Sequence, residues 1–167
     1  MKADRDSGMK AAAPQRTSEW LHVYSDGASR GNPGPAGAGA QARNARGEVL
    51  LEISDFLGTV TNNVAEYWAL ILILEASRSL GYRRIKAHMD SQLVANQITG
   101  GYRVKKEWLK PLVARVRTLL DEYQDVEVQY IPRENNTECD ALANSAVNDG
   151  LLGLKAPLLT DEDGSLF

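Results

Sequence analysis

Cysteine, histidine and long apolar runs are all scarce in this sequence. Among 167 residues Cys139 is the only cysteine, so an internal disulfide is excluded and we interpret this residue as a small buried thiol. The apolar run from Ala69 to Ala76 is far shorter than the roughly 20 residues of a membrane-spanning helix, and the first residues lack a signal-peptide pattern. We therefore expect a soluble cytoplasmic protein without a membrane partner.

The composition is that of an ordinary globular protein, with 43% hydrophobic and 25% charged residues, which favours one compact domain. A net charge of -3 argues against a nucleic-acid binder, because lysine and arginine supply most non-specific affinity for phosphates. The charge is unevenly distributed, however. Between Gly101 and Arg117, six basic residues stand against one acid, with Tyr102 and Trp108 among them. This segment is either a solvated helix face or a nucleic-acid edge.

Hydrophobic periodicity divides the chain into an arm, a domain and a tail. Residues 1–19 mix charged, small and proline residues, which is typical of a disordered arm. Residues 20–150 carry the periodic segments, and residues 151–167 form a tail whose leucine pairs could pack back on the domain. The expected strands span Trp20 to Ser25, Ala38 to Ala45, Glu48 to Leu57, Arg83 to Met89 and Val126 to Ile131, and the expected helices span Asn62 to Leu80, Ser91 to Ile98, Lys106 to Tyr123 and Asn136 to Asn148.

This order of elements predicts an α/β fold. Three strands that follow one another begin as hairpins, and the glycine-rich stretch from Asp26 to Gly39 is expected to be the first turn. The later strands are joined through helices, which favours parallel pairing. The helix from Asn62 is apolar on nearly every face, as expected for a helix buried inside the domain. We predict a five-stranded mixed sheet flanked by helices.

Four acidic residues stand at ends of these elements: Asp26, Glu66, Asp90 and Asp140. If the first and fourth strands are neighbours, Asp26 and Asp90 meet at matching carboxyl ends, and the other two reach them from helix starts. Gathered carboxylates repel one another and must take up protons or cations. Oxygen ligands of this kind favour Mg²⁺ or Mn²⁺, and a pair of such ions can hydrolyse a phosphodiester.

Each of these acids also has a structural interpretation. Glu66 follows Asn63 by three residues, as Asp140 follows Thr137, so both could close capping boxes at helix starts. Asp26 and Asp90 could be turn residues at strand ends. The sequence alone leaves these alternatives open.

Four separated motifs together resemble the type 1 ribonuclease H family, over essentially residues 20–150. They are Tyr24–Gly37 (YSDGASRGNPGPAG), Thr61–Glu66 (TNNVAE), Met89–Gln92 (MDSQ) and Asn136–Ala143 (NTECDALA). The resemblance implies a ribonuclease H-like fold and an endoribonuclease that hydrolyses the RNA strand of RNA:DNA hybrids. It also implies that Asp26, Glu66, Asp90 and Asp140 are catalytic carboxylates binding two Mg²⁺ or Mn²⁺ ions, with Asp26 bridging them. The expected products carry 3′-hydroxyl and 5′-phosphate ends.

The resemblance extends to contacts with the hybrid. Residues matching Asn32, Asn62 and Gln92 contact its minor groove in the family, and Thr61 stands where a hydroxyl helps to hold a DNA phosphate. Arg103, Lys105 and Lys106 are expected to meet phosphates of the DNA strand. With the resemblance, the basic segment is therefore interpreted as a nucleic-acid edge rather than as a solvated helix face. Contacts of this kind read the shape of the duplex and its 2′-hydroxyls, so cleavage should be largely independent of sequence.

Two departures from the family pattern bear on catalysis. Many members carry a histidine in the loop before the last helix, but here Tyr130–Asn136 (YIPRENN) contains none. Arg133 could contact the scissile phosphate in its place and Glu134 could engage metal or water. The extra helix of the basic protrusion is also missing from Gly100–Lys110, so affinity for the hybrid should be lower and more sensitive to salt. We interpret the only histidines, His22 and His88, as structural.

The resemblance leaves two alternatives to a strict ribonuclease H. The same fold could act on a wider range of substrates, including double-stranded RNA. It could also be a hybrid-binding module without catalysis, in which the acids serve only as caps. We expect a monomer in either case.

Overall fold

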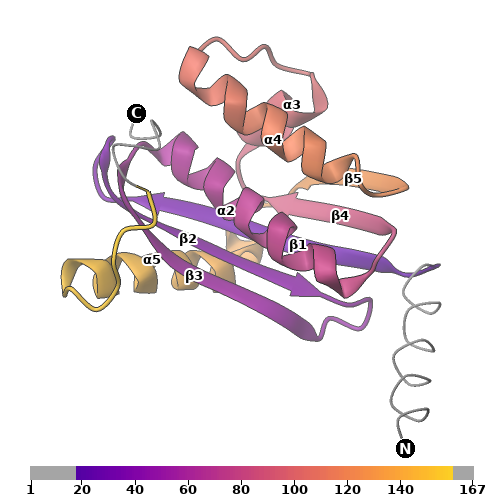
Figure 1. Cartoon of the computed structure of the whole chain (residues 1–167), viewed down its shortest axis with the longest axis horizontal. Coiled ribbons are helices and arrows are strands. Elements are labelled where there is room, and N and C mark those ends of the chain that lie inside the picture. The colour runs from indigo at the N-terminus through magenta and orange to yellow at the C-terminus, as the bar shows by residue number, and fades with distance from the viewer. Residues whose placement is uncertain (1–17, 160–167) are drawn as a thin grey trace, which may run out of the picture.

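The structure, a computed structural model, describes residues 18–159 (Figure 1). Its strands are β1 (Trp20–Ser29), β2 (Gly34–Arg43), β3 (Val49–Val60), β4 (Arg84–Met89) and β5 (Asp125–Tyr130). Its helices are α2 (Asn62–Ser77), α3 (Gln92–Thr99), α4 (Lys110–Leu120) and α5 (Thr137–Leu151), with short 3-10 turns at Arg78–Leu80, Glu107–Leu109 and Arg133–Asn135. The predicted order of elements is confirmed. The predicted arm lies almost wholly outside the described residues.

The five strands form one mixed sheet in the order β3-β2-β1-β4-β5. β2 pairs antiparallel with both β1 and β3, whereas β4 pairs parallel with both β1 and β5. The expected neighbourhood of the first and fourth strands is therefore confirmed. Because β1 and β4 run in the same direction, their carboxyl ends lie at the same edge of the sheet.

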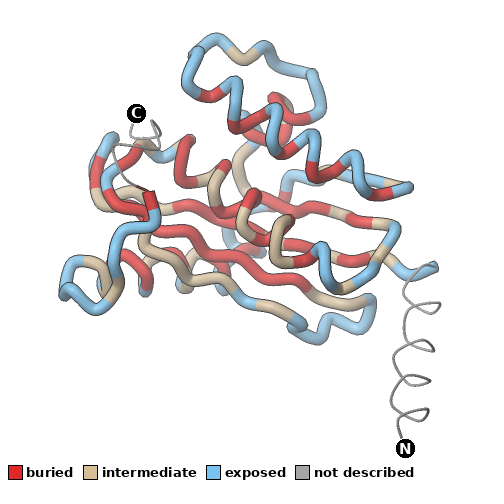
Figure 2. The backbone as a smooth tube through the Cα atoms, viewed as in Figure 1, coloured by how far each residue is buried: buried red, intermediate tan, exposed pale blue. Residues whose placement is uncertain are grey.

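Helices cover the two faces of the sheet differently. α2 crosses one face over β1 and β2, with α4 packed on it, while α5 lies on the opposite face against β2 and β3 (Figure 1). The central strands are the most continuously buried segments (Figure 2). The α2 side chains from Val64 to Leu74 are largely buried between sheet and helix, which confirms the predicted internal helix. Within residues 18–159, no helix combines the length and apolarity needed to cross a membrane.

The expectation of a long glycine-rich turn is wrong. β1 continues to Ser29 and β2 begins at Gly34, so only residues 30–33 connect them. The glycines of β2 allow close packing of α5 instead: a Cβ on Gly39 would lie 2.1 Å from the Cys139 carbonyl oxygen, and one on Gly37 would lie 2.2 Å from that of Ala143. Small residues therefore mark the helix–sheet contact here.

The C-terminal segment extends the packed domain beyond the predicted boundary. α5 ends at Leu151, and the backbone N–H groups of Leu158 and Leu159 then donate to the carbonyls of Phe56 and Leu57 on β3, at 2.9 and 3.1 Å. Leu159 is buried, whereas Leu151 and its neighbour in the expected leucine pair are exposed. The tail thus packs back through Leu159, and the acidic residues after it lie outside the described range.

A candidate metal-binding carboxylate site

Parallel pairing of β1 and β4 brings Asp26 and Asp90 to one edge of the sheet. Ser25 pairs with Met89 in this ladder, so the residues that follow each of them are neighbours in space. Asp26 lies within β1 and is 8% exposed, while Asp90 comes directly after β4. A turn role for Asp26 is therefore wrong, since three more strand residues follow it.

Glu66 reaches this edge from the first turns of α2. The helix is capped by Thr61, whose hydroxyl accepts a hydrogen bond from the Val64 N–H at 3.3 Å. The alternative of a capping box from Asn63 to Glu66 is therefore wrong. One carboxylate oxygen from each of Asp26, Glu66 and Asp90 lies within 4.8 Å of the others, and no further such group of three occurs in residues 18–159.

Asp140 approaches the same centre from α5, on the opposite side of the sheet. Its charge helps to raise the pKa of Asp26, but it does not join the group of three. Its own carboxylate accepts from the Asn144 amide at 3.3 Å. The N-cap of α5 is Asn136 rather than Thr137, so the second capping box is wrong as well. The structure brings three predicted acids together and places the fourth against Asp26.

Burial and repulsion from neighbouring acids make the carboxyl groups of Asp26 and Glu66 reluctant to ionise. Burial, followed by the charges of Asp90, Asp140 and Glu66, raises the pKa of Asp26 to about 8. The pKa of Glu66 rises to about 7, through burial and the charge of Asp90, although a hydrogen bond from Ser91 and the positive charge of Arg133 oppose the shift. A divalent cation would relieve this repulsion, and an all-oxygen donor set suits Mg²⁺ or Mn²⁺. The residues present therefore fit a metal site.

The predicted groove contacts lie around this edge. The Asn32 side-chain oxygen accepts from the Asn62 backbone N–H at 2.9 Å, which joins the β1–β2 turn to the start of α2. Gln92 is the first residue of α3 and is exposed. These three residues and the capping Thr61 thus stand on turns and helix starts next to the carboxylates.

The basic segment divides into two sets of side chains. Arg103, Lys105 and Lys106 are exposed and line an open cavity of about 460 Å³ beside Asn63 and Tyr102. The remaining three are engaged within the fold: Lys110 with Glu107, Arg115 with Glu75, and Arg117 with the carbonyls of Gln97 and Ile98. Only the first set is available to a phosphate backbone.

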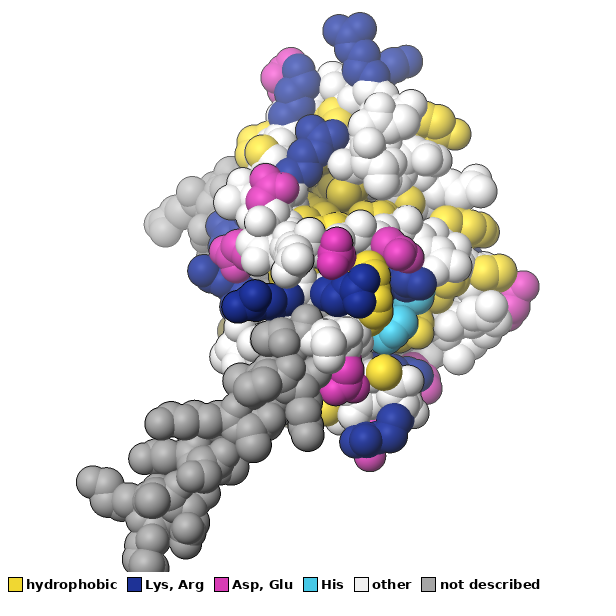
Figure 3. All heavy atoms as spheres, turned by 90° about the vertical axis from the view of Figure 1, so that its right-hand side faces the viewer, with side chains coloured by type: hydrophobic (Ala, Val, Ile, Leu, Met, Phe, Trp, Pro, Cys, Tyr) yellow, Lys and Arg dark blue, Asp and Glu magenta, His cyan; other side chains and the backbone are white. Residues whose placement is uncertain are grey.

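Arg133 and Glu134 occupy the 3-10 turn just before α5 and are exposed. The charge of Arg133 acts on the pKa of Glu66, which places the guanidinium within electrostatic reach of the carboxylates. The two histidines are engaged elsewhere: His22 Nδ1 lies 3.1 Å from His88 Nε2, and the His88 ring stacks on Tyr24. Figure 3 shows histidine among basic and acidic side chains on one surface.

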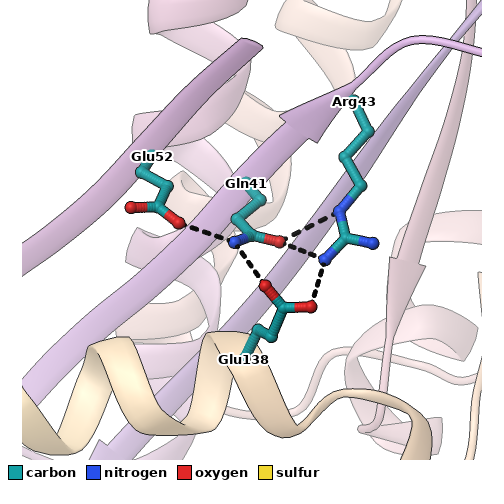
Figure 4. Close-up of polar contacts among 4 residues, drawn as sticks. All are labelled: Gln41, Arg43, Glu52 and Glu138. Carbon is teal, nitrogen blue, oxygen red and sulfur yellow. Dashed lines mark hydrogen bonds and ion pairs between the residues drawn. The ribbon is translucent and has the colours of Figure 1, made fainter. Parts of the chain in front are cut away.

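Two supporting groups were not predicted from the sequence. Gln41 is fully buried and bonds to Glu52, Arg43 and Glu138, while Arg43 also pairs with Glu138 at 2.9 Å (Figure 4). This polar clasp fixes β2 and β3 to the first turn of α5. The second is Asn136, whose amide contacts Asp90. In the sequence, the only indication of this clasp is Gln41 itself, a polar residue within the alanine- and glycine-rich strand β2.

Comparisons with known proteins agree with this geometry. A family model described as reverse transcriptase-like matches residues 24–146. Ribonuclease HI of Halobacterium salinarum is 43% identical over 129 residues, covering 77% of this chain and 65% of that protein. The bifunctional protein Rv2228c of Mycobacterium tuberculosis is 40% identical, over 75% of this chain and 35% of its own length. The chain thus spans about two thirds and one third of these relatives.

Solved structures match over nearly their whole length. The crystal structure of the Halobacterium salinarum enzyme has a TM-score of 0.75 and is covered to 98%. LC11-RNase H1, isolated from compost by a metagenomic approach, was solved in complex with an RNA/DNA hybrid; it is 38% identical and 99% covered, with a TM-score of 0.75. Sequence motifs, sheet topology and these likenesses agree, and the chain belongs to the type 1 ribonuclease H family.

Proposed function

We propose that residues 20–150 form an endoribonuclease domain that hydrolyses the RNA strand of RNA:DNA hybrids. The observation that carries this proposal is the convergence of Asp26, Glu66 and Asp90 within 4.8 Å, with the charge of Asp140 acting on the first of them. Family membership and the hybrid complex of LC11-RNase H1 support the same substrate class. Cleavage is largely independent of sequence and leaves 3′-hydroxyl and 5′-phosphate ends.

The four carboxylates hold two Mg²⁺ or Mn²⁺ ions in this proposal. Asp26 is the bridging ligand, because it is the most enclosed of the four and is acted on by all three others. Bound ions supply an activated water and stabilise the departing 3′ oxygen. The chain itself orients the carboxylates on strands and helix starts and keeps them close together. Cations offset the repulsion between the carboxylates.

Contacts with the hybrid are assigned to the residues surrounding this edge. Asn32, Asn62 and Gln92 face the minor groove, while Thr61, Arg103, Lys105 and Lys106 meet phosphates of the DNA strand. Arg133 is assigned to the scissile phosphate, since its charge already acts on Glu66. The guanidinium offers only hydrogen-bond donors and is therefore no general base, and Glu134 is the nearer choice for engaging water. All of these residues come from one chain, so the proposed site is complete in a monomer.

A cleavage assay with three matched duplexes tests the proposal. RNA:DNA, RNA:RNA and DNA:DNA of one sequence, each labelled on one strand, are incubated with Mg²⁺ or Mn²⁺, and with EDTA as the metal-free control. We expect cutting of the RNA strand of the hybrid alone. Cutting of RNA:RNA at a similar rate would instead establish the wider substrate range, and binding without cutting in either metal would establish a hybrid-binding module.

A further inference from the structure

Asn136 joins three of the elements that carry the carboxylates. It is 3% exposed and lies between the 3-10 turn Arg133–Asn135 and α5. Its side-chain nitrogen donates to the Ser25 carbonyl oxygen at 2.9 Å and to Asp90 Oδ2 at 3.1 Å. The residue thus connects the β1 residue that precedes Asp26, the acid that follows β4 and the start of the helix that bears Asp140.

The two hydrogen bonds to Ser25 and Asp90, rather than capping of α5, set the orientation of the Asn136 side chain. Asparagine at a helix N-cap ordinarily accepts a hydrogen bond from the first turn, but this side chain makes no such cap bond. Its Oδ1 is buried without a hydrogen-bond partner in the described structure. Leaving a buried acceptor unpaired costs stability, so the conformation favours Ser25 and Asp90 over the best arrangement for the helix.

The chemistry of the amide suits the task of holding an ionised acid. Asp90 repels both Asp26 and Glu66, and it is the member of the group outside regular secondary structure. A neutral donor restrains its carboxylate without neutralising it, whereas a lysine or arginine would compete with a cation. One oxygen of Asp90 is thereby held in place by Asn136 while the carboxylate stays open to a metal.

We propose that Asn136 is a positioning residue that holds Asp90 in the geometry needed to bind metal. The inference rests on the proposed metal site. Asn136 acts through Asp90 rather than on the hybrid, so its loss weakens metal binding and slows turnover while leaving the KM for hybrid nearly unchanged.

Two variants test this role, Asn136→Ala and Asn136→Ser. Serine is itself a favoured N-cap residue, so the second variant keeps the helix start while losing the reach to Asp90. The matched control is Asn148→Ala, at an exposed position further along α5. Mn²⁺ binding is measured by calorimetry on each protein without substrate, unfolding by urea, and kcat and KM on the hybrid at saturating metal.

We expect Mn²⁺ affinity to fall roughly 10- to 100-fold in both variants, as for other partners that orient metal ligands, with KM for hybrid within about twofold of the parent. The control should match the parent. Parental Mn²⁺ affinity in a folded variant would overturn the proposal, as would failure of both variants to unfold cooperatively, which would make Asn136 a folding residue. Failure of the proposed function looks different, because the parent itself would then neither bind Mn²⁺ nor cleave hybrid.

Discussion

The absence of a side chain at Gly27 allows Glu66 to reach the sheet. A Cβ at Gly27 would lie 2.4 Å from the backbone nitrogen of Glu66 and 2.3 Å from the carbonyl carbon of Ala65. The first turns of α2 therefore rest directly on β1, one residue beyond Asp26. The spacing between the clustered carboxylates of Asp26 and Glu66 depends on this contact between two backbones.

Gly27→Ala should consequently damage both stability and activity. The added methyl group must push α2 away from β1, and overpacking of this kind costs about 1–3 kcal/mol. Because the displaced helix carries Glu66, hybrid cleavage should also fall, by roughly tenfold or more. Urea unfolding and kcat measure the two effects. Gly101→Ala is the stability control, since its Cβ would meet only Asn96 at 3.4 Å; equal stability of both variants would contradict the packing argument.

Replacing Asp26 should separate catalysis from stability. Asp26→Asn removes the proposed bridging ligand, so cleavage should fall by roughly 10³-fold or more. The same change relieves repulsion in the metal-free protein and should raise its unfolding free energy by about 1–3 kcal/mol at pH 8. Asp121→Asn, at an exposed position after α4, should change neither quantity. Parental cleavage by Asp26→Asn would remove this residue from the metal site.

The raised pKa of Asp26 also predicts how stability depends on pH without metal. The folded protein holds this proton up to a pKa of about 8, whereas the unfolded chain releases it near 3.8. The folded state therefore binds more protons across this interval, and stability falls as pH rises from about 4 to about 8. Urea unfolding in EDTA measures the slope. The fall of stability with pH should be shallower in Asp26→Asn and in the parent with Mg²⁺ than in the parent with EDTA. An identical slope in all three would refute the raised pKa of Asp26.

Salt dependence should identify the lysines that meet phosphates. Each contact of this kind adds roughly one unit to the slope of log affinity against log salt. Lys105→Ala with Lys106→Ala should therefore weaken hybrid binding and reduce the slope by about two. Arg78→Ala also removes a positive charge, but this arginine pairs with Glu122 at the far end of α2, and the slope of the variant should equal the parent's. An unchanged slope in the double variant would place the hybrid elsewhere.

Two arginines on neighbouring positions should differ in their contribution to stability. Arg43 is 24% exposed and belongs to the clasp with Gln41 and Glu138, whereas Arg46 is 80% exposed and pairs only along the β2–β3 turn with Glu48. Arg43→Ala should cost about 1–3 kcal/mol because it leaves a buried amide oxygen short of donors. Arg46→Ala should cost about 0.5 kcal/mol or less. Equal losses in urea unfolding would mean that the clasp adds nothing beyond a surface pair.

The order of elements could be predicted from sequence because its signals are local, whereas the four acids were singled out chiefly by the family resemblance. Hydrophobic periodicity marks helices such as α4, and parallel pairing follows from the helical crossover. The predicted boundary between β1 and β2 was wrong because Gly37 and Gly39 are residue types common in turns. In the structure they lie within β2 and make room for α5. The helices α2 and α5 begin at or next to the predicted residues, but the two capping boxes were wrong because the N-caps are Thr61 and Asn136. Only the folded chain distinguishes these choices.

Asn136 was recognised in the sequence only as part of a family motif. Its contacts to Ser25 and Asp90 span 111 and 46 residues, and no spacing rule connects positions so far apart. The clasp is similar, because Gln41 and Glu138 are 97 residues apart. Ligand acids stand out by type and position, whereas the groups that orient them become visible only through tertiary contacts.

The most direct test of a metal-dependent hybrid endoribonuclease is to examine the cut ends of an RNA strand annealed to DNA. In Mg²⁺ or Mn²⁺ the RNA should be cut internally, and the fragments should prime extension by a DNA polymerase because they carry 3′-hydroxyl groups. The DNA strand should stay intact, and EDTA should prevent cutting. RNA left whole in both metals, or fragments that cannot be extended, would contradict the assignment of Asp26, Glu66, Asp90 and Asp140 to this chemistry.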